Sequence, residues 1–470
     1  MSIFRRADFS SKLKRVADRQ YPRLKIIENG LVCVKVHGSR MLAETAATEG
    51  TFPATFPAMR APTAMFVSSR IASMAESATL AVGAKVVAAK AKGHDVVAFA
   101  MGEPDFDTPA NIKQAAITAL EKGMTKYAPT AGEKSAREAI AAKLTRENGV
   151  PTAFDQVTIT AGAKHAIYMA LQAIVEPGRG DEVLLPSPAW VSYKPLIELA
   201  GAKCIEIAGA VENGFRITPS QLAASINAKT VGIVWNSPSN PCGIAYPAVE
   251  VRALCDELSK HEKIVVISDE IYEKLIYPEI APGLTHFSPG SFDALRHRTI
   301  TVNGLSKSYA MTGWRVGYLA APLAMAKELI KLQGQMTNSI PSFFYPAIVE
   351  ALTNSADSVE TMRARFATRA VLMHEALATV ADIRSVAPNA AFYAFPDVSA
   401  HFGKTSPQAT KITSAQSFAD ALLEEAHVAV VPGEDFGECA RGNIRLSFAC
   451  TEANITNGVE RLRTWVASLR

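Results

Sequence analysis

The sequence has 470 residues, of which 48% are hydrophobic and 20% charged. This composition is typical of a globular protein, and it excludes a fibrous repeat or a chain that is disordered throughout. No uncharged apolar run reaches the roughly 18 residues that a transmembrane helix needs, so we expect no membrane partner. Six cysteines are scattered without a CxxC pair or zinc-like spacing, which predicts no metal site and a reducing, cytoplasmic compartment.

The net charge of +4 is unevenly distributed along the chain. Residues 1–64 hold eleven basic and five acidic residues, a net of +6, whereas the remainder holds 38 basic and 40 acidic residues, a net of −2. A body so close to neutral disfavours a nucleic-acid-binding enzyme, and we expect no nucleic-acid partner.

Residues 1–64 have no clear structural pattern and end in a proline-rich stretch, Thr51–Thr63, that is typical of a linker. Their basic character leaves three hypotheses open. They are a transit peptide for a mitochondrion or plastid, an extension upstream of a genuine start at Met65, or a DNA-binding unit. Three acids in the first 30 residues count against a transit peptide, and the absence of helix-turn-helix spacing counts against DNA binding. We therefore expect 1–64 to be a disordered, targeting or mis-assigned extension.

From about Arg70, helical patterns alternate with short apolar runs, which is typical of βαβ units and a mostly parallel sheet. Four apolar runs each precede residues capable of chemistry: Val157–Thr160, Val231–Trp235, Ile264–Ile267 and Thr299–Val302. Ligands of open α/β sheets bind beyond the carboxyl ends of the strands. If the four runs are parallel neighbours, one crevice collects the polar residues that follow them: Asn240, Asp269, Tyr272 and Lys307.

Beyond residue 317 the pattern predicts helices, notably over 323–335 and 347–377. Alternating stretches follow near residues 391–395, 428–431 and 443–448. They favour a smaller α+β domain in the carboxyl-terminal part.

Three local features suggest chemistry, although each has a plainer structural interpretation. The small residues Ala161–Ala163 lead into a helix whose first N–H groups would attract a phosphate, and Arg315 could pair with the same phosphate. A plain turn and a surface arginine are the commoner explanations. Lys307 stands in a small, polar context where partial desolvation would lower the pKa of its amine and favour Schiff-base formation, whereas most lysines are simply solvated.

The string around Lys307, SKSYAMTGWRVG at 306–317, resembles the pyridoxal-phosphate attachment site of class I aminotransferases, in which lysine and arginine stand eight positions apart. Other motifs, in the same order, resemble those of the bacterial-type aspartate/prephenate aminotransferases. They are GEPDFDTP at 102–109, KYAP at 126–129, WVSY at 190–193, NSPSNPCG at 236–243, SDEIY at 268–272, and VPG at 431–433 with RLS at 445–447. The resemblance extends from Met65 to Arg470, and so many collinear motifs leave little room for chance.

The resemblance implies the α/β fold of type I aminotransferases, with a large domain built on a mostly parallel seven-stranded sheet and a smaller α+β domain. An amino-terminal arm with part of the small domain would span 65–110, the large cofactor-binding domain 111–345, and the small domain 346–470. The implied protein is a homodimer that uses pyridoxal phosphate. It would move an amino group from an amino acid, aspartate foremost, to a 2-oxo acid such as 2-oxoglutarate by a ping-pong mechanism.

The resemblance also implies three catalytic residues. Lys307 would hold the cofactor through its amine and, once released by substrate, move a proton at the substrate Cα. Asp269 would face the pyridine nitrogen and favour its protonated form. Tyr272, together with Asn240, would hydrogen-bond the phenolic oxygen.

Further residues would bind the phosphate and the ring of the cofactor. Trp190 would stack on the ring, Ala163 and Lys164 would offer backbone N–H groups to the phosphate, and Arg315 would be its charged clamp. Tyr127 would reach that phosphate from the partner subunit.

For the substrate, Arg445 would take the α-carboxylate in a two-pronged pair, since the guanidinium fork suits that task. Gly102 would lie near the same carboxylate, and Trp190 and Asn240 would border the substrate as well.

The sequence departs from the family pattern at a few positions. Ala75 stands where relatives often have a lysine that reads a second substrate carboxylate, which would weaken selectivity for dicarboxylic substrates, while the Lys164 side chain remains as a candidate reader. Cys242 replaces a commoner threonine, and Asn389–Tyr393 replaces a shorter Gly-Ala-Phe-Tyr. Two alternatives stay open: another pyridoxal-phosphate reaction such as β-elimination, or a transcription regulator with an aminotransferase-like domain.

Overall fold

The computed structural model describes residues 26–27, 31–32, 66–72, 74 and 78–470, in two units, Met1–Val67 and Ser68–Arg470. In the first unit two short strands, β1 (Ile26–Ile27) and β2 (Leu31–Val32), pair antiparallel. The other expectations for residues 1–64, and the substitution at Ala75, lie outside the described residues.

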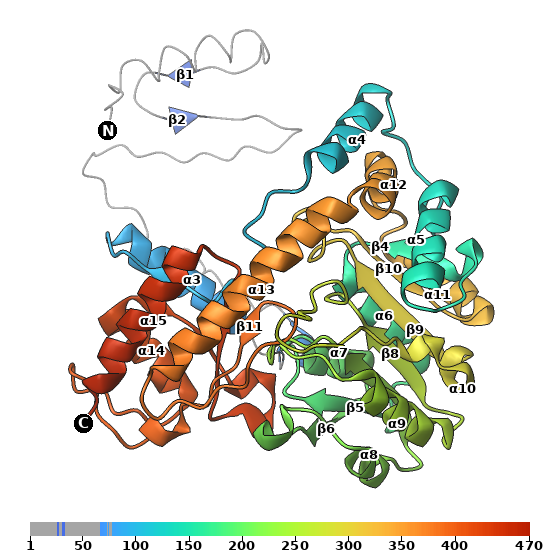
Figure 1. Cartoon of the computed structure of the whole chain (residues 1–470). Helices are drawn as coiled ribbons and strands as arrows, with labels where there is room; N and C mark the ends of the chain where they lie inside the picture. The colour runs from blue at the N-terminus through green and yellow to red at the C-terminus, as the bar shows by residue number, and fades with distance from the viewer. Residues whose placement is uncertain (1–25, 28–30, 33–65, 73, 75–77) are drawn as a thin grey trace, which may run out of the picture. The chain divides into compact units, whose positions relative to one another are not determined.

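A seven-stranded sheet forms the centre of the second unit (Figure 1). Its strands, in spatial order, are β4 (Val157–Thr160), β10 (Gly317–Ala320), β9 (Thr299–Gly304), β8 (Val265–Asp269), β7 (Thr230–Asn236), β5 (Glu182–Ser187) and β6 (Lys203–Ala208). β10 is antiparallel to both of its neighbours, and the other pairs are parallel. The predicted mostly parallel seven-stranded sheet is therefore confirmed.

All four predicted strand runs form strands, but they are not all neighbours. β7, β8 and β9 are adjacent, whereas β10 separates β4 from β9. The helical pattern expected after residue 317 is wrong for Tyr318, Leu319 and Ala320, which belong to β10, because so short a run carries no periodicity that distinguishes a strand from a buried helix. Since β10 is antiparallel to both β4 and β9, β4 still points the same way as the rest, and its carboxyl end reaches the common edge.

Helices cover both faces of the sheet, because alternate side chains of each buried strand point to opposite sides. Ile233 and Val266 belong to one core, with α8 (Pro219–Ser225), α9 (Ala248–Ser259) and α10 (Asp293–Arg296). The adjacent residues Val234 and Ile267 belong to the opposite core. That core contains residues of α6 (Ala163–Ile174), α7 (Tyr193–Ala200) and α11 (Leu323–Met336).

A third core lies beside β4 and β10, where α4 (Ala110–Glu121), α5 (Lys134–Glu147) and α12 (Tyr345–Asn354) pack together. The single helix expected over 347–377 is two helices, α12 and α13 (Ala356–Ala378). They are separated by Ser355, whose φ of −118° and ψ of 17° break the helical run.

The carboxyl-terminal part has a core of its own, built by α13 with α14 (Ala415–Ala426) and α15 (Glu452–Ala467) (Figure 1). A three-stranded sheet in the order β11 (Tyr393–Ala394), β14 (Ile444–Ser447) and β13 (Val431–Pro432) lies with these helices. Beside it, β12 (Val428–Ala429) pairs in parallel with β3 (Val97–Ala98). The remaining helices are α2 (Ser69–Ala72) and α3 (Ala78–Ala91), and α3 contacts β13.

Among the helices that the structure describes, none has the length and apolar character that crossing a bilayer requires.

Candidate active site

The carboxyl ends of the parallel strands bring the polar residues of the motifs to one edge of the sheet. β8 ends at Asp269, and Lys307 follows the last residue of β9 by three positions. The loop after β7 carries Asn240, whose backbone N–H donates to Asn236 Oδ1, and the Asn236 side chain donates to the Asp269 carbonyl. Neighbouring strand ends are thus tied together by side-chain hydrogen bonds.

Lys307 has a largely buried amine at this edge of the sheet, where the crevice is expected. Its Nζ donates a hydrogen bond to the Gly102 carbonyl oxygen and lies 5.8 Å from the centre of the Phe392 ring. Burial, with the positive charge of Arg445 nearby, lowers the pKa of Lys307 to about 8. At neutral pH about a tenth of such amines are unprotonated and nucleophilic, far more than for a solvated lysine.

Asp269 is a buried carboxylate held on both oxygens. Its Oδ2 accepts a 2.7 Å hydrogen bond from the Tyr193 hydroxyl, and its Oδ1 accepts one of 3.2 Å from the Ile271 amide. Burial raises the pKa of Asp269 to about 6, while these two hydrogen bonds oppose the rise. The group is therefore ionised at neutral pH and poised to take a positively charged partner.

Two tyrosines meet beside Lys307. The hydroxyls of Tyr272 and Tyr393 are 2.9 Å apart and share a hydrogen bond in which either can be the donor. Burial raises the pKa of both, so both stay protonated. A Cβ on Gly102 would lie 3.0 Å from the Tyr393 hydroxyl, so a glycine leaves room for that tyrosine.

Arg445 is a buried guanidinium, 1% exposed. Its Nη1 donates to Asn240 Oδ1 at 3.1 Å and its Nη2 to the Ala100 carbonyl at 2.9 Å, while its Nε has no partner. The rings of Tyr393 and Phe436 lie 4.8 and 5.3 Å from its Cζ. Within the described part of the chain no carboxylate forms an ion pair with it, which leaves its charge available for an anionic ligand.

A candidate anion site lies where α6 begins. Gly162 has a φ of 87°, and a Cβ there would lie 2.4 Å from Arg315 Nη2, so the guanidinium is pressed against the start of the helix. Arg315 Nη1 donates to the Thr312 carbonyl at 3.1 Å. The first amides of α6, from Ala163 and Lys164, and the exposed Arg315 thus offer N–H groups and positive charge at one place.

Trp190 and Lys164 line a cavity of about 600 Å³ next to this anion site. Lys164 Nζ is 4.8 Å from the Trp190 ring, which itself meets Tyr193 edge-on at 5.3 Å. Burial, with the charge of Arg315, lowers the pKa of Lys164. A cation over an aromatic wall is suited to reading a carboxylate on a ligand in the cavity.

The structure therefore brings most of the expected site residues to the same edge of the sheet, near the end of β8: Gly102, Ala163, Lys164, Trp190, Asn240, Asp269, Tyr272, Lys307, Arg315 and Arg445. It does not bring Tyr127 there, since that side chain is 95% exposed between α4 and α5. The role expected for Tyr127 requires a second subunit and stays a prediction.

Sequence reasoning missed two members of the cluster, Tyr193 and Tyr393. Tyr193 stands in the WVSY motif and Tyr393 ends the segment Asn389–Tyr393 that departs from the family pattern, but nothing local assigns either a partner. Their hydroxyls bond residues 76 and 121 positions away, so only the folded chain reveals them.

Comparison with known proteins places this geometry in context. Residues 94–462 match the family model described as aminotransferase class I and II. The chain is 40% identical to an aspartate/prephenate aminotransferase of Cereibacter sphaeroides over 86% of this chain and 99% of that protein. It is 38% identical to an aspartate aminotransferase of Bacillus subtilis over 86% and 99%.

Two solved structures show the same agreement. The aspartate aminotransferase of Rhizobium meliloti superposes with a TM-score of 0.82 at 37% identity, covering 86% of this chain and 100% of that one. The aspartate aminotransferase of Thermus thermophilus with maleate superposes with a TM-score of 0.78 at 40% identity, covering 85% and 99%.

Proposed function

Because this chain belongs to the aminotransferase class I and II family, as its collinear motifs predict, we propose that it transfers an amino group from aspartate to a 2-oxo acid such as 2-oxoglutarate. The donor would leave as its oxo acid before the acceptor binds the same site. The observation that carries the proposal is the meeting, at one edge of the sheet, of a largely buried amine, a buried carboxylate and a buried guanidinium without an ion-pair partner. They belong to Lys307, Asp269 and Arg445.

Pyridoxal phosphate fits the residues of this crevice. Its aldehyde requires an amine of lowered pKa, which Lys307 supplies, and its pyridine nitrogen requires a buried carboxylate, which Asp269 supplies. Its phosphate matches the start of α6 with Arg315, where Gly162 lets the backbone approach closely. When bound, the cofactor supplies an electron sink that stabilises negative charge on the substrate Cα.

Each residue of the crevice has a definite task in this proposal. Lys307 would bind the cofactor through Nζ and, after the incoming amine displaces it, move a proton at the substrate Cα. Asp269, oriented by Tyr193, would keep a proton on the pyridine nitrogen. Tyr272 and Asn240 would donate to the phenolic oxygen. None of these tasks requires a metal ion.

Two cations support a dicarboxylic substrate. Arg445 would bind the α-carboxylate, since its Nε is unpaired and aromatic rings shield it from water. Lys164 would bind the side-chain carboxylate of aspartate across the cavity that it shares with Trp190. Several relatives of this chain are named for aspartate, which agrees with this arrangement.

A homodimer completes the proposal. Apolar side chains of the second unit are exposed along its first 20 residues, with exposed fractions of 48% at Ile71, 75% at Leu80 and 69% at Val87. Exposed apolar surface of this kind marks an interface. In such a dimer Tyr127 would reach the phosphate bound to the second subunit.

The domain boundaries and the compartment also remain proposals. We infer an arm with part of the small domain over 65–110, a large domain over 111–345 and a small domain over 346–470. All five cysteines of the described chain are free, which agrees with a reducing, cytoplasmic compartment.

The test is a half-reaction with purified enzyme and pyridoxal phosphate. A visible absorbance band should form with the cofactor, shift on adding aspartate, and return on adding 2-oxoglutarate. Borohydride should fix the cofactor to the peptide that contains Lys307. Lys307→Ala should abolish both this attachment and the spectral changes. No spectral change with any amino acid would refute the proposal, and pyruvate and ammonia released without an oxo acid would indicate β-elimination instead.

A further inference from the structure

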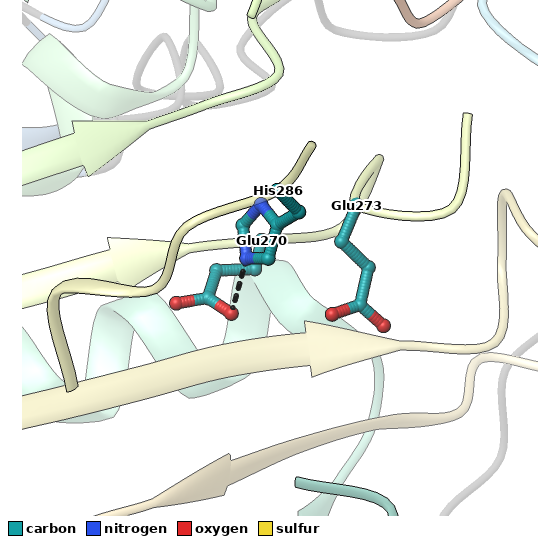
Figure 2. Close-up of side chains that lie close together, drawn as sticks. All are labelled: Glu270, Glu273 and His286. Atoms are coloured by element: carbon teal, nitrogen blue, oxygen red, sulfur yellow. Dashed lines mark hydrogen bonds and ion pairs between the residues drawn. The ribbon is translucent and has the colours of Figure 1, made fainter. Parts of the chain in front are cut away.

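A buried polar cluster lies directly behind Asp269. One carboxylate oxygen each of Glu270 and Glu273 and one imidazole nitrogen of His286 lie within 4.8 Å of one another. Figure 2 shows the three side chains. Glu270 follows the last residue of β8, and Glu273 lies in the turn after it. His286 belongs to a later loop, and Figure 2 shows its ring directed at the Glu270 carboxylate.

Glu270 is fully buried, and both of its oxygens are saturated with hydrogen bonds. Oε1 accepts from the Ser268 and Ser288 hydroxyls at 2.9 and 2.5 Å, and Oε2 accepts from Asn148 Nδ2 at 2.8 Å and His286 Nε2 at 2.9 Å. The donors come from β8, from α5's carboxyl end and from the 286–288 loop. One side chain therefore joins three separate segments.

The cluster holds its own cation, which argues against a metal ion there. Lys143 is 1% exposed, forms an ion pair with Glu273, and donates a 2.7 Å hydrogen bond to Asn148 Oδ1. Burial opposes a charge on His286, but the charge and the hydrogen bond of Glu270 outweigh it and raise the pKa of His286. Two acids thus lie beside one buried lysine and a histidine whose pKa the neighbouring carboxylate raises.

The backbone beside Glu270 carries two residues of the active site. Asp269 precedes it and bonds Tyr193, whereas Tyr272 follows two positions later and bonds Tyr393. The Glu270 amide donates to the Val302 carbonyl at 2.9 Å, and its carbonyl accepts from the Glu273 amide at 3.0 Å. Because side chains alternate along an extended strand, Glu270 points away from the crevice while Asp269 points into it.

We propose that Glu270, locked by His286, is a positioning residue that fixes the segment 269–275 and so aims Asp269 and Tyr272 at the cofactor. This inference rests on the proposed function for its catalytic consequence. Without the Glu270 side chain, the turn would keep the ion pair of Glu273 with Lys143 but lose the bonds that Asn148, Ser288 and His286 make to it. The Asp269 carboxylate and the Tyr272 phenol would then be held less firmly in orientation. Small misplacements of this kind are costly to catalysis.

The matched experiment compares Glu270→Ala with Glu270→Gln, which keeps the shape of the side chain and most of its hydrogen bonds. A control, Arg298→Met, removes a buried side chain that bonds the carbonyls of Leu258, His261 and Ile264 at the opposite edge of the sheet. The readouts are hydrogen exchange of the peptide 269–275 in the apoenzyme, the dissociation constant for pyridoxal phosphate, thermal stability, and the kinetic constants with aspartate.

For Glu270→Ala we expect faster exchange of 269–275, at least tenfold weaker binding of pyridoxal phosphate, and a kcat about tenfold lower with KM within twofold. Glu270→Gln should restore affinity to within about threefold of wild type. Arg298→Met should lower the melting temperature without changing the affinity or the exchange of 269–275.

The proposal is overturned if Glu270→Ala binds pyridoxal phosphate and exchanges like the wild type, or if Arg298→Met loses as much affinity at equal loss of stability. It is also overturned if the wild type holds zinc or magnesium in a 1:1 ratio that Glu270→Ala loses. If the wild type does not bind pyridoxal phosphate at all, the proposed function fails, and the exchange of 269–275 alone then decides the positioning role.

Discussion

The hydroxyl of Tyr193 donates a 2.7 Å hydrogen bond to Oδ2 of Asp269, and both side chains are 2% exposed. Burial drives the pKa of Asp269 up to about 6, and this bond is the largest effect that opposes the rise. Tyr193 stays a donor at every working pH, because burial and the neighbouring carboxylate raise its own pKa well above the usual value. The pair therefore keeps a buried carboxylate ionised where the fold would otherwise favour its neutral form.

Replacing this donor tests its effect on the charge of Asp269. In Tyr193→Phe the ionised carboxylate loses a stabilising hydrogen bond, so the pKa of Asp269 rises and the acid limb of the kcat/KM profile moves to higher pH. We expect kcat/KM with aspartate to fall about tenfold near pH 7 and to approach the wild-type value near pH 9, since a hydrogen bond to a charged group contributes about 1.5–3 kcal/mol.

The control is Tyr318→Phe, a buried tyrosine of β10 whose hydroxyl does not bond Asp269. Its profile should match that of the wild type. An equal loss at all pH values in Tyr193→Phe would contradict the explanation through Asp269.

The lowered pKa of Lys307 predicts a cost in stability. Folding takes this amine from its ordinary value of 10.5 to about 8, chiefly through burial, so the folded state binds its proton less tightly than the unfolded state. The penalty is complete below about pH 8 and disappears above about pH 10.5, and a shift of this size corresponds to about 3 kcal/mol. Lys307→Met should therefore stabilise the apoenzyme near pH 7, by a margin that shrinks as the pH approaches 10.

Urea unfolding of the apoenzyme at the two pH values measures this margin. The exposed Lys327→Met serves as the reference and should change stability equally at both. A stabilisation by Lys307→Met that does not depend on pH would indicate better packing and not relief of a buried charge.

Lys164 is expected to determine preference for a dicarboxylic substrate. Lys164→Met keeps the length of the side chain and its contact with Trp190 but removes the charge. We expect kcat/KM to fall about 30-fold with aspartate, since a charge-assisted bond of about 2 kcal/mol is lost, and to stay within about threefold with alanine.

Lys194 provides the matched variant, because it lines the same cavity but its Nζ is engaged 3.0 Å from Glu206 Oε1. Lys194→Met should leave the ratio between aspartate and alanine unchanged. Equal losses with both substrates in Lys164→Met would show that Lys164 does not determine the preference for aspartate.

Gly162 is predicted to be essential for binding the phosphate group. In Gly162→Ala the new methyl would lie 2.4 Å from Arg315 Nη2, so the guanidinium must leave the start of α6. Fluorescence titration should show at least tenfold weaker binding of pyridoxal phosphate, because one charged phosphate contact is lost, but unchanged binding of pyridoxal, which has no phosphate.

Gly178→Ala separates this clash from backbone strain. Gly178 has a φ of 85°, close to the 87° of Gly162, but a Cβ there would meet nothing within 4 Å. Gly178→Ala should lower the free energy of unfolding by about 1–2 kcal/mol, which is the backbone strain expected for Gly162→Ala as well. It should leave the binding of pyridoxal phosphate and of pyridoxal unchanged.

Local sequence motifs predict the family, the type of sheet and most residues of the candidate site. A run of apolar residues followed by a polar one predicts both a strand and the residue at its end, so Asp269 and Lys307 could be placed before any fold was known. The same local patterns failed in two places. Gly317–Ala320 is a strand, and Ser355 divides the single helix that the pattern predicts. In these places the neighbouring elements, and not the local pattern, decide the conformation.

By itself, the sequence determined which residues can do chemistry and at which strand ends they stand, because hydrophobicity and its periodicity are properties of short segments. Only the tertiary structure decided which of them act together. Tyr193 on Asp269, Tyr393 on Tyr272 and His286 on Glu270 are contacts across 76, 121 and 16 positions, made where strands and loops converge. Such contacts depend on the path of the whole chain, and that path brings a buried carboxylate, its donor and its anchor to a single edge of the sheet.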